Sequence, residues 1–296
     1  MENSDTSSAT HNAVATRIQE RTSPTFPAGQ GDIALVTIDN TVFYVHRAVL
    51  RYSSHVFETI LENGGGEEDE SSQPRLKIET DASTLDHLLA FAHSNMSSPS
   101  IDDVNVLAAI FRAAKRYEMD GVLQQLRKSL MEVKMVHDVM VQPLFVKAPL
   151  AVLVMSYAFD CPAEGRLALR ECIKGRLEDH VAGAVEFDIP AELISTILRL
   201  RQERETWCLA KLNSVRWPTS NFYYCACKCG DWRVQVMSQL RTKPQFETLK
   251  QVFSIPRNCA SGHVIPQPVD QTTLDSWTLE ISQLEQVIPT LPRLSR

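Results

Sequence analysis

A cysteine-rich segment in the C-terminal third of the chain carries the residues whose type and spacing could do metal chemistry. Cys225, Cys227 and Cys229 alternate with other residues, so an extended backbone would turn all three thiols to one face. Downstream, Cys259 and His263 form a Cys-x-x-x-His pair. Thiolate and imidazole are ligands that Zn²⁺ prefers, and four of them complete a closed structural site. These five residues are therefore candidate ligands of a structural zinc ion.

The same cysteines have a second interpretation, which the sequence leaves open. Cys-x-Cys-x-Cys is not the usual Cys-x-x-Cys zinc motif, and no Cys-x-x-Cys stands at a predicted helix start, where a redox pair is expected. Reduced thiols that pack as small apolar groups also fit the pattern. Seven cysteines, an odd number, argue against a disulfide framework. Apart from the candidate structural zinc, we expect no cofactor.

Sequence motifs that support catalysis are absent elsewhere in the chain. We find no P-loop, no G-x-G-x-x-G, no G-x-S-x-G and no H-E-x-x-H. The glycine run at 64–66 leads into acidic residues at 67–70, whose charges would repel a phosphate group. We therefore expect a binding protein and not an enzyme.

The composition and net charge of the chain limit the classes of partner that we expect it to bind. The 296 residues are 44% hydrophobic, enough for two folded parts, and the formal net charge of −6 gives no electrostatic reason to bind nucleic acid or an anionic membrane. The most apolar stretch, 148–159, is shorter than the roughly 18–20 residues that span a bilayer, so we interpret it as a buried helix. A polar start predicts no secretory signal, and we expect an intracellular location, in cytoplasm or nucleus.

The elements that must position these residues fall into four predicted segments. Residues 1–30 are rich in Ser, Thr, Asn and Pro and are expected to form a disordered N-terminal tail. Residues 31–134 combine strand and helix patterns, and residues 135–213 are mostly helical. Residues 214–296 form a smaller region that contains the cysteine cluster and three of the tryptophans.

The second segment has the element order of a compact α+β unit. Two β-rich runs, 32–38 and 41–45, are separated by a short turn and predict a hairpin. Ser53 is a candidate N-cap for a helix over 54–61, with Phe57 on its core face. The remaining predicted elements are a strand at 76–79 and helices over 84–93, 104–117 and 122–133. A small sheet packed against these helices would bury both in one core.

The following segment shows helical spacing without a sharp motif. Prolines stand at or near its predicted helix starts, where proline is tolerated: Pro143, Pro149, Pro162 and Pro190. The basic run at 199–204 is interleaved with acidic and polar residues, so we interpret it as a solvated helix face.

Several blocks of residues 31–134 occur in the order found in one interaction-domain family. The most specific block is His46-Arg47-x-x-Leu50 followed by Ser54 and Phe57. The other blocks are Asp32, Phe43, Leu76-Lys77-Ile78, Leu88-Leu89-Ala90-Phe91, Leu107, Ala113-Ala114, Tyr117 and Met119. In these residues the segment resembles the BTB/POZ family. The loops at 63–74 and 94–100 resemble insertions of its fungal members.

The resemblance implies an α+β fold, with a BTB/POZ-like small sheet flanked by helices, followed by an α-helical extension. It also implies a protein–protein interaction module, a self-associating adaptor or scaffold that forms a homodimer or a heterodimer with another BTB protein. The candidate interaction residues are Asp32, Arg47, Val49, Leu50, Tyr52, Val56 and Ile60. Asp32 and Arg47 fit a structural ion pair as well. His46 is expected to be a packed, hydrogen-bonded core histidine rather than a catalytic one.

Two alternatives follow from the same family. The first is a substrate adaptor of a cullin-type ubiquitin ligase, with a cullin as partner. Family adaptors often carry an apolar-x-Glu element in the loop after the helix that ends near Leu61, but here that loop is acidic and glycine-rich, and Ile60-Leu61-Glu62 lies at the helix end. The second alternative is a transcription-related regulator, although the sequence contains no classical zinc finger or basic DNA-reading helix.

Overall fold

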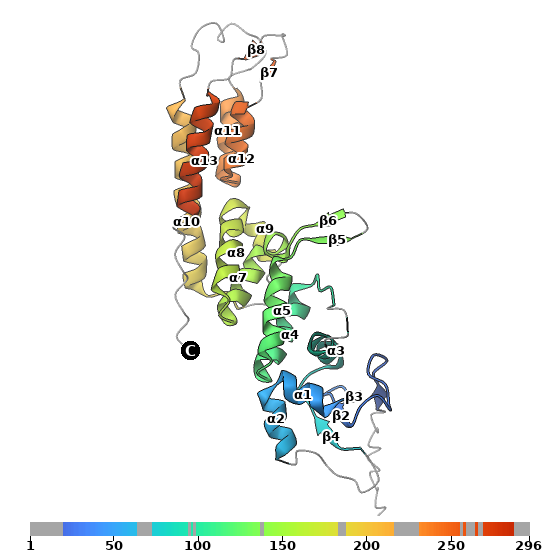
Figure 1. The fold of residues 1–296 in the computed structure, drawn as a ribbon. Coiled ribbons are helices and arrows are strands. Elements are labelled where there is room, and N and C mark those ends of the chain that lie inside the picture. Colours follow the sequence, from blue (N-terminus) through green and yellow to red (C-terminus); the bar gives the residue numbers. More distant parts are fainter. Residues whose placement is uncertain are drawn as a thin grey trace, which may run out of the picture. The chain divides into compact units, whose positions relative to one another are not determined.

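The computed structural model of the chain describes residues 20–63, 73–93, 96, 99–136, 139–182, 188–215, 231–254, 257–258, 264–265 and 269–286. The chain folds into two compact units, and Figure 1 labels most of their elements. The first unit contains the residues up to Pro99 together with Arg112–Val122, and the second contains Ser100–Phe111 and the residues from Leu123 onward. Helices α4 (Val104–Arg116) and α5 (Asp120–Met131) therefore contribute residues to both units.

A small mixed sheet forms the base of the first unit. Its strands are β1 (Arg21–Thr22), β2 (Ile33–Val36), β3 (Thr41–Val45) and β4 (Arg75–Lys77), in the order β1-β3-β2-β4. β2 and β3 are antiparallel, with Leu35 opposite Phe43, and β1 and β4 join them in parallel. The predicted hairpin is thus confirmed. Its turn places Asn40 at φ 57°, a left-handed conformation that asparagine adopts more readily than most residues.

Three helices complete the core of this unit: α1 (Arg47–Ser53), α2 (His55–Glu62) and α3 (Ala82–Ala92). The side chains that are almost fully removed from solvent come from both the sheet and the helices: Leu35, Phe43, Leu50, Phe57, Leu85, Leu88 and Leu89. The predicted α+β class is confirmed, and Phe57 is a core residue as expected.

Residues 20–30 differ from the disordered tail predicted for 1–30. β1 pairs with β3, and Phe26 is buried with its ring centroid 6.0 Å from that of Phe43. The hydroxyl of Ser23 accepts hydrogen bonds from the backbone N–H groups of Thr25 and Phe26, which fixes the turn before Phe26. Sequence patterns do not predict this ordered segment, because a single buried aromatic residue in a proline-containing turn has no periodicity.

Helices dominate the second unit. After α5 come α6 (Leu144–Lys147), α7 (Pro149–Ala158), α8 (Pro162–Lys174), α9 (Leu177–Ala182) and α10 (Ala191–Ser214), followed by α11 (Asp231–Thr242), α12 (Phe246–Ser254) and α13 (Gln271–Gln286). Two short hairpins pair β5 (Lys134–Val136) with β6 (Val139–Val141) and β7 (Arg257–Asn258) with β8 (Val264–Ile265).

Helix α7 confirms the buried helix predicted for the most apolar stretch. Every residue from Pro149 to Ser156 is buried, and α7 packs closely on α8. Glycine suits this close approach, because a Cβ atom on Gly165 would lie 3.1 Å from the Cβ atom of Ser156, a contact tighter than most. Among the described residues, no helix is both long and apolar enough to cross a membrane.

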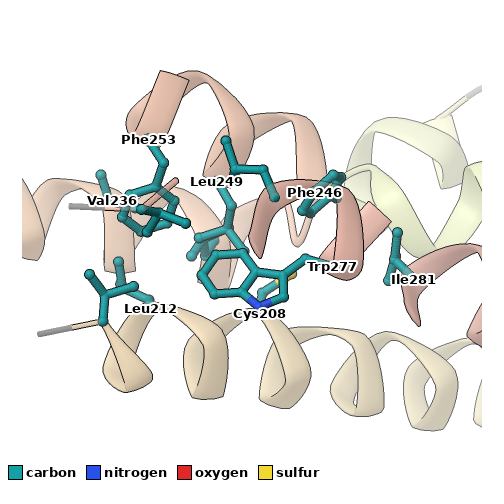
Figure 2. Close-up of a cluster of buried hydrophobic side chains, with 12 residues drawn as sticks. Cys208, Leu212, Val236, Phe246, Leu249, Phe253, Trp277 and Ile281 are labelled. Atoms are coloured by element: carbon teal, nitrogen blue, oxygen red, sulfur yellow. The ribbon is translucent and has the colours of Figure 1, made fainter. Parts of the chain in front are cut away.

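A separate hydrophobic core joins the C-terminal half of α10 to α11, α12 and α13 (Figure 2). Its buried side chains are Cys208, Leu212, Val215, Val236, Leu240, Phe246, Leu249, Phe253, Val269, Leu274, Trp277 and Ile281. The ring centroids of Phe253 and Trp277 lie 5.7 Å apart in an edge-to-face arrangement. The described part of residues 214–296 is thus mainly helical, and α10 supplies one wall of its core.

Candidate protein-interaction surface

The start of helix α1 is fixed by a side chain from the sheet. The carboxylate of Asp32, just before β2, accepts a hydrogen bond of 2.7 Å from the backbone N–H of Arg47. This contact satisfies one of the N–H groups that a helix leaves free at its N-terminus. The contact between Asp32 and Arg47 thus uses the backbone of Arg47 and is a helix cap, which is different from the ion pair between side chains that was one interpretation of these residues.

His46 differs from the buried histidine that we expected. Its side chain is exposed, and its backbone carbonyl accepts hydrogen bonds from the N–H groups of Val49 and Leu50, at 3.0 and 3.3 Å. His46 is the N-cap residue of α1, and its side chain makes no capping hydrogen bond. The prediction of a core role was wrong because a residue outside the first helical turn projects away from the packed face.

Helix α2 is held by a different serine from the one predicted. Ser54, not Ser53, is the N-cap, and its hydroxyl accepts a hydrogen bond of 3.0 Å from the N–H of Phe57. The hydroxyl of Ser54 also donates to the backbone carbonyl of Tyr117. Ser53 belongs to α1, where its hydroxyl donates to the carbonyl of Val49. Two adjacent serines have the same capping chemistry, so the sequence could not distinguish them.

An aromatic stack locks α2 in place. The rings of Phe57 and Tyr117 are stacked with centroids 4.7 Å apart, and both side chains are buried. Together with the contacts of Ser54, this stack fixes the rotation of α2 about its axis. The α2 residues that do not face the core are therefore presented in a defined orientation.

Four of the predicted interaction residues on the α1–α2 pair are at least partly exposed to solvent. Tyr52 is 95% exposed, and Val49, Val56 and Ile60 are half-buried. We call these four residues the α1–α2 face. Leu50 is fully buried and belongs to the domain's own core, so it is not available to a partner in this conformation.

The helix pair and the sheet belong to a segment whose sequence matches a known domain family. Residues 29–134 match the family model of the BTB/POZ domain. This segment is a BTB/POZ domain. The match covers a minority of the chain, and a search of curated proteins gave no significant match. BTB domains mediate protein–protein interactions and are not catalytic, so the BTB domain of this chain is a protein-interaction module.

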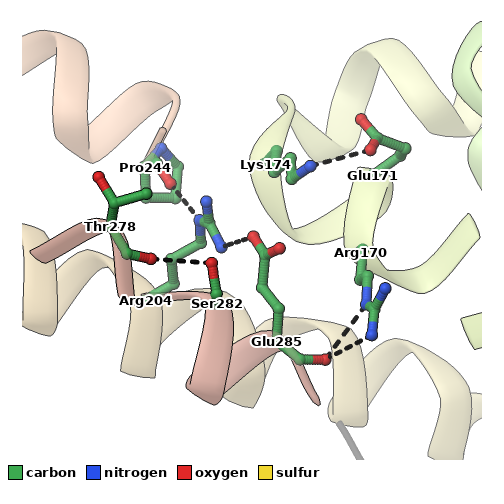
Figure 3. Close-up of polar contacts among 8 residues, drawn as sticks. All are labelled: Arg170, Glu171, Lys174, Arg204, Pro244, Thr278, Ser282 and Glu285. Carbon is green, nitrogen blue, oxygen red and sulfur yellow. Dashed lines mark hydrogen bonds and ion pairs between the residues drawn. The ribbon is translucent and has the colours of Figure 1, made fainter. Parts of the chain in front are cut away.

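Outside the BTB domain, a polar clamp ties helix α13 to the rest of the second unit (Figure 3). Arg204 of α10 is 5% exposed, and its guanidinium donates to the carboxylate of Glu285 and to the carbonyl of Pro244, each at 2.6 Å. Arg170 of α8 donates two hydrogen bonds to the backbone carbonyl of Glu285. Cations are favourable at this position because the last carbonyls of a helix lack intrahelical partners.

The clamp corrects the prediction that residues 199–204 form a solvated face. Only part of the run is solvated: Arg199 pairs with Glu203 on the exposed side of α10, at 2.7 Å. Arg204 continues the buried series Leu193, Ile197 and Leu200 at helical spacing. This periodicity could have predicted that Arg204 is buried, but its charge favoured an exposed position.

A groove of about 570 Å³ runs beside this clamp on α10 and α13. Its apolar lining includes Leu200, Trp207 and Ala210 of α10 and Ile281 and Leu284 of α13. The charged residues that line the groove are already paired with one another, Arg199 with Glu203 and Arg204 with Glu285. A ligand in this groove would therefore be recognised by apolar contact and not by charge.

The candidate zinc ligands Cys225, Cys227, Cys229, Cys259 and His263 lie outside the described residues. Among the residues that are described, no group of three or more His, Cys, Asp or Glu side chains could hold a metal ion. The thiols of Cys161, Cys172 and Cys208 are buried, and none of these three cysteines forms a disulfide with another described residue. Burial raises the pKa of the Cys208 thiol to about 11 and raises that of Cys172 further, so these two act as small apolar groups.

Proposed function

We propose that this chain is an adaptor that self-associates through the α1–α2 face of its BTB domain. The observation that carries the proposal is the exposure of Tyr52, at 95%, beside the half-buried side chains of Val49, Val56 and Ile60. Tyrosine is enriched at the centres of protein interfaces because it offers a large apolar area and a polar tip. A rigid helix pair also loses little conformational entropy when a partner binds.

The geometry suits a two-fold symmetric contact. Val49 and Tyr52 are one turn apart on α1, and Val56 and Ile60 are one turn apart on α2, so each helix carries one such pair on one of its sides. In an isologous dimer these residues would face their own copies. A heterodimer with another BTB protein uses the same residues and is the alternative partner.

A charge introduced at the centre of the face tests the proposal. We expect Tyr52→Glu to weaken self-association more than about tenfold, because two buried carboxylates would face each other near the symmetry axis. Sedimentation equilibrium of the full chain measures the effect. Ile38→Glu is the matched control, since Ile38 is 68% exposed in the same unit but is not part of the α1–α2 face. Equal association of both variants and the unchanged chain would contradict the proposal.

A cullin scaffold is a further candidate partner of the BTB domain. The element Ile60-Leu61-Glu62 forms the last turn of α2, with Ile60 and Leu61 half-buried and Glu62 exposed. Because Ile60 also belongs to the α1–α2 face, self-association through that face would cover Ile60 and make it unavailable to a cullin. We therefore favour self-association, and direct binding of purified cullin by the Tyr52→Glu chain would support the alternative.

A further inference from the structure

The hairpin of β5 and β6 is a sheet without a neighbour. Its strands are antiparallel, with Met135 opposite Met140, and within the described part of the chain no third strand joins either outer edge. Figure 1 shows the hairpin projecting from the helices of its own unit. An isolated two-stranded hairpin is only marginally stable in water, and each free edge presents backbone N–H and C=O groups to another strand.

The hairpin is also apolar for an exposed element. Met140 is 69% exposed, and Val133, next to the first strand, is 52% exposed. All three residues of β6 are apolar: Val139, Met140 and Val141. Proteins usually protect an exposed edge strand with a charged residue or a proline, and β6 contains neither. These features indicate that β6 pairs with an apolar, extended strand.

We propose that β6 pairs with β6 of a second copy of this chain, antiparallel and about a two-fold axis at Met140. A two-fold contact requires a strand that is complementary to itself. The sequence Val-Met-Val meets this requirement, because antiparallel pairing about its centre sets Val139 opposite Val141 and Met140 opposite Met140. No like charges meet across the axis. The product is a four-stranded sheet in the order β5-β6-β6-β5.

This contact is independent of the α1–α2 face and extends what the chain could assemble. Three residues per strand bury much less than the roughly 1,200 Å² of a stable interface, so the pairing is weak by itself and depends on concentration. Where the α1–α2 face also pairs, each chain has two different symmetric contacts.

A charge-swap experiment at Met140 tests the axis directly. The full chain is used with Tyr52→Glu, so that failure of the α1–α2 proposal does not affect the result. We expect its mass to rise with concentration in sedimentation equilibrium, and Met140→Glu or Met140→Lys to abolish the rise, because like charges would face each other across the axis. An equimolar mixture of the Glu and Lys variants should restore it.

The controls separate this contact from other causes. Leu279→Glu, at an exposed position of α13, should leave the association unchanged. Met140 is exposed, so both substitutions should leave the circular dichroism spectrum of the chain unchanged. A constant single-chain mass before substitution, or a mixture that does not reassociate, would overturn the proposal. So would protection of the β6 amides from hydrogen exchange only on addition of an extended apolar peptide, since the edge would then bind a partner peptide.

Discussion

At the scale of single residues, Arg204 connects three parts of the second unit. Its guanidinium reaches the carboxylate of Glu285 on α13 and the carbonyl of Pro244 between α11 and α12, while its own backbone lies in α10. The side chain of Arg204 is 4% exposed, so loss of either contact would leave part of a buried guanidinium without a hydrogen-bond partner. The clamp therefore makes the position of α13 specific, in addition to the apolar contacts of Trp277 and Ile281.

Replacing Arg204 should be costly, and a second arginine on the same helix supplies the control. We expect Arg204→Ala to lower the free energy of unfolding by roughly 3 kcal/mol, because it removes one partner of a largely buried ion pair. Arg199→Ala should cost about 0.5 kcal/mol or less, since the pair of Arg199 with Glu203 is exposed. Urea denaturation measures both. Similar values for the two variants would show that the clamp adds no stability.

The carboxylate of Asp81 caps helix α3 and should make its stability depend on pH. It accepts hydrogen bonds from the backbone N–H and the hydroxyl of Thr84, at 2.9 and 2.7 Å. Burial alone would raise the pKa of Asp81, but these hydrogen bonds outweigh it, and the pKa lies below the ordinary value of 3.8. The folded state therefore favours the ionised carboxylate. The contribution of Asp81 to the free energy of unfolding is fully present above pH 3.8 and is lost as the pH falls through the lowered pKa.

Replacement of Asp81 checks this assignment. Asp81→Ala should cost about 1 kcal/mol near neutral pH, the usual value of an N-cap, and the difference from the unchanged chain should shrink in acid. Asp81→Asn keeps a capping oxygen and should cost less. Thermal unfolding followed over pH measures all three chains. A difference that stays constant down to the lowest pH would exclude the carboxylate as its source.

At the scale of elements, the sequence predicted those parts whose periodicity matches one buried face. The hairpin of β2 and β3, helices α2 to α5 and the buried helix α7 belong to this class. The proline positions are also confirmed, since Pro149 and Pro162 lie in the first turns of α7 and α8 and Pro143 and Pro190 are N-caps. These elements can be predicted from the spacing of nearby residues, and a single sequence contains that information.

Other elements could not be predicted because their stability comes from distant residues. β1 consists of two residues and exists only because β3 lies beside it. α11 to α13 bury their apolar residues against α10, so their periodicity is shared among four helices. The hairpin of β5 and β6 was not predicted; it lies at the start of a segment that was predicted only to be mostly helical. On the candidate interaction surface, spacing identified the helix pair but could not separate core Leu50 from exposed Tyr52.

The structural zinc ion stays a prediction. If Cys225, Cys227, Cys229, Cys259 and His263 supply the ligands, purified protein should contain zinc, and Cys227→Ser should lower its content. Chelation should increase hydrogen exchange in α11 to α13 and not in the BTB domain, because a structural site holds its own segment together. Zinc-free protein, purified without chelator and with α11 to α13 still protected, would reject the site.

At the scale of the whole molecule, helices α4 and α5 of the segment that matches the BTB family contribute residues to both compact units. Within the second unit, Phe111 of α4 stacks on Phe159, which follows α7, with centroids 5.0 Å apart. Arg127 of α5 forms two hydrogen bonds with Glu164 of α8, at 2.8 and 3.1 Å. The last helices of the BTB match are therefore packed by the helices that follow it.

This packing predicts how fragments should behave. A fragment of residues 20–134 should melt at a lower temperature than a fragment of residues 20–182, because it leaves Phe111 and Arg127 without these partners. Differential scanning calorimetry compares the two. Equal melting temperatures would show that the BTB domain is complete at residue 134 and that the later helices add nothing to it.

The central claim is that the BTB domain pairs through the α1–α2 face, and the mass of the chain in solution tests it most directly. The measurement is light scattering at micromolar concentration on the full chain carrying Met140→Glu, so that the β6 edge does not contribute. We predict the mass of two chains, falling to that of one chain when Tyr52→Glu is added and unchanged when Ile38→Glu is added. The mass of a single chain before either substitution would contradict self-association.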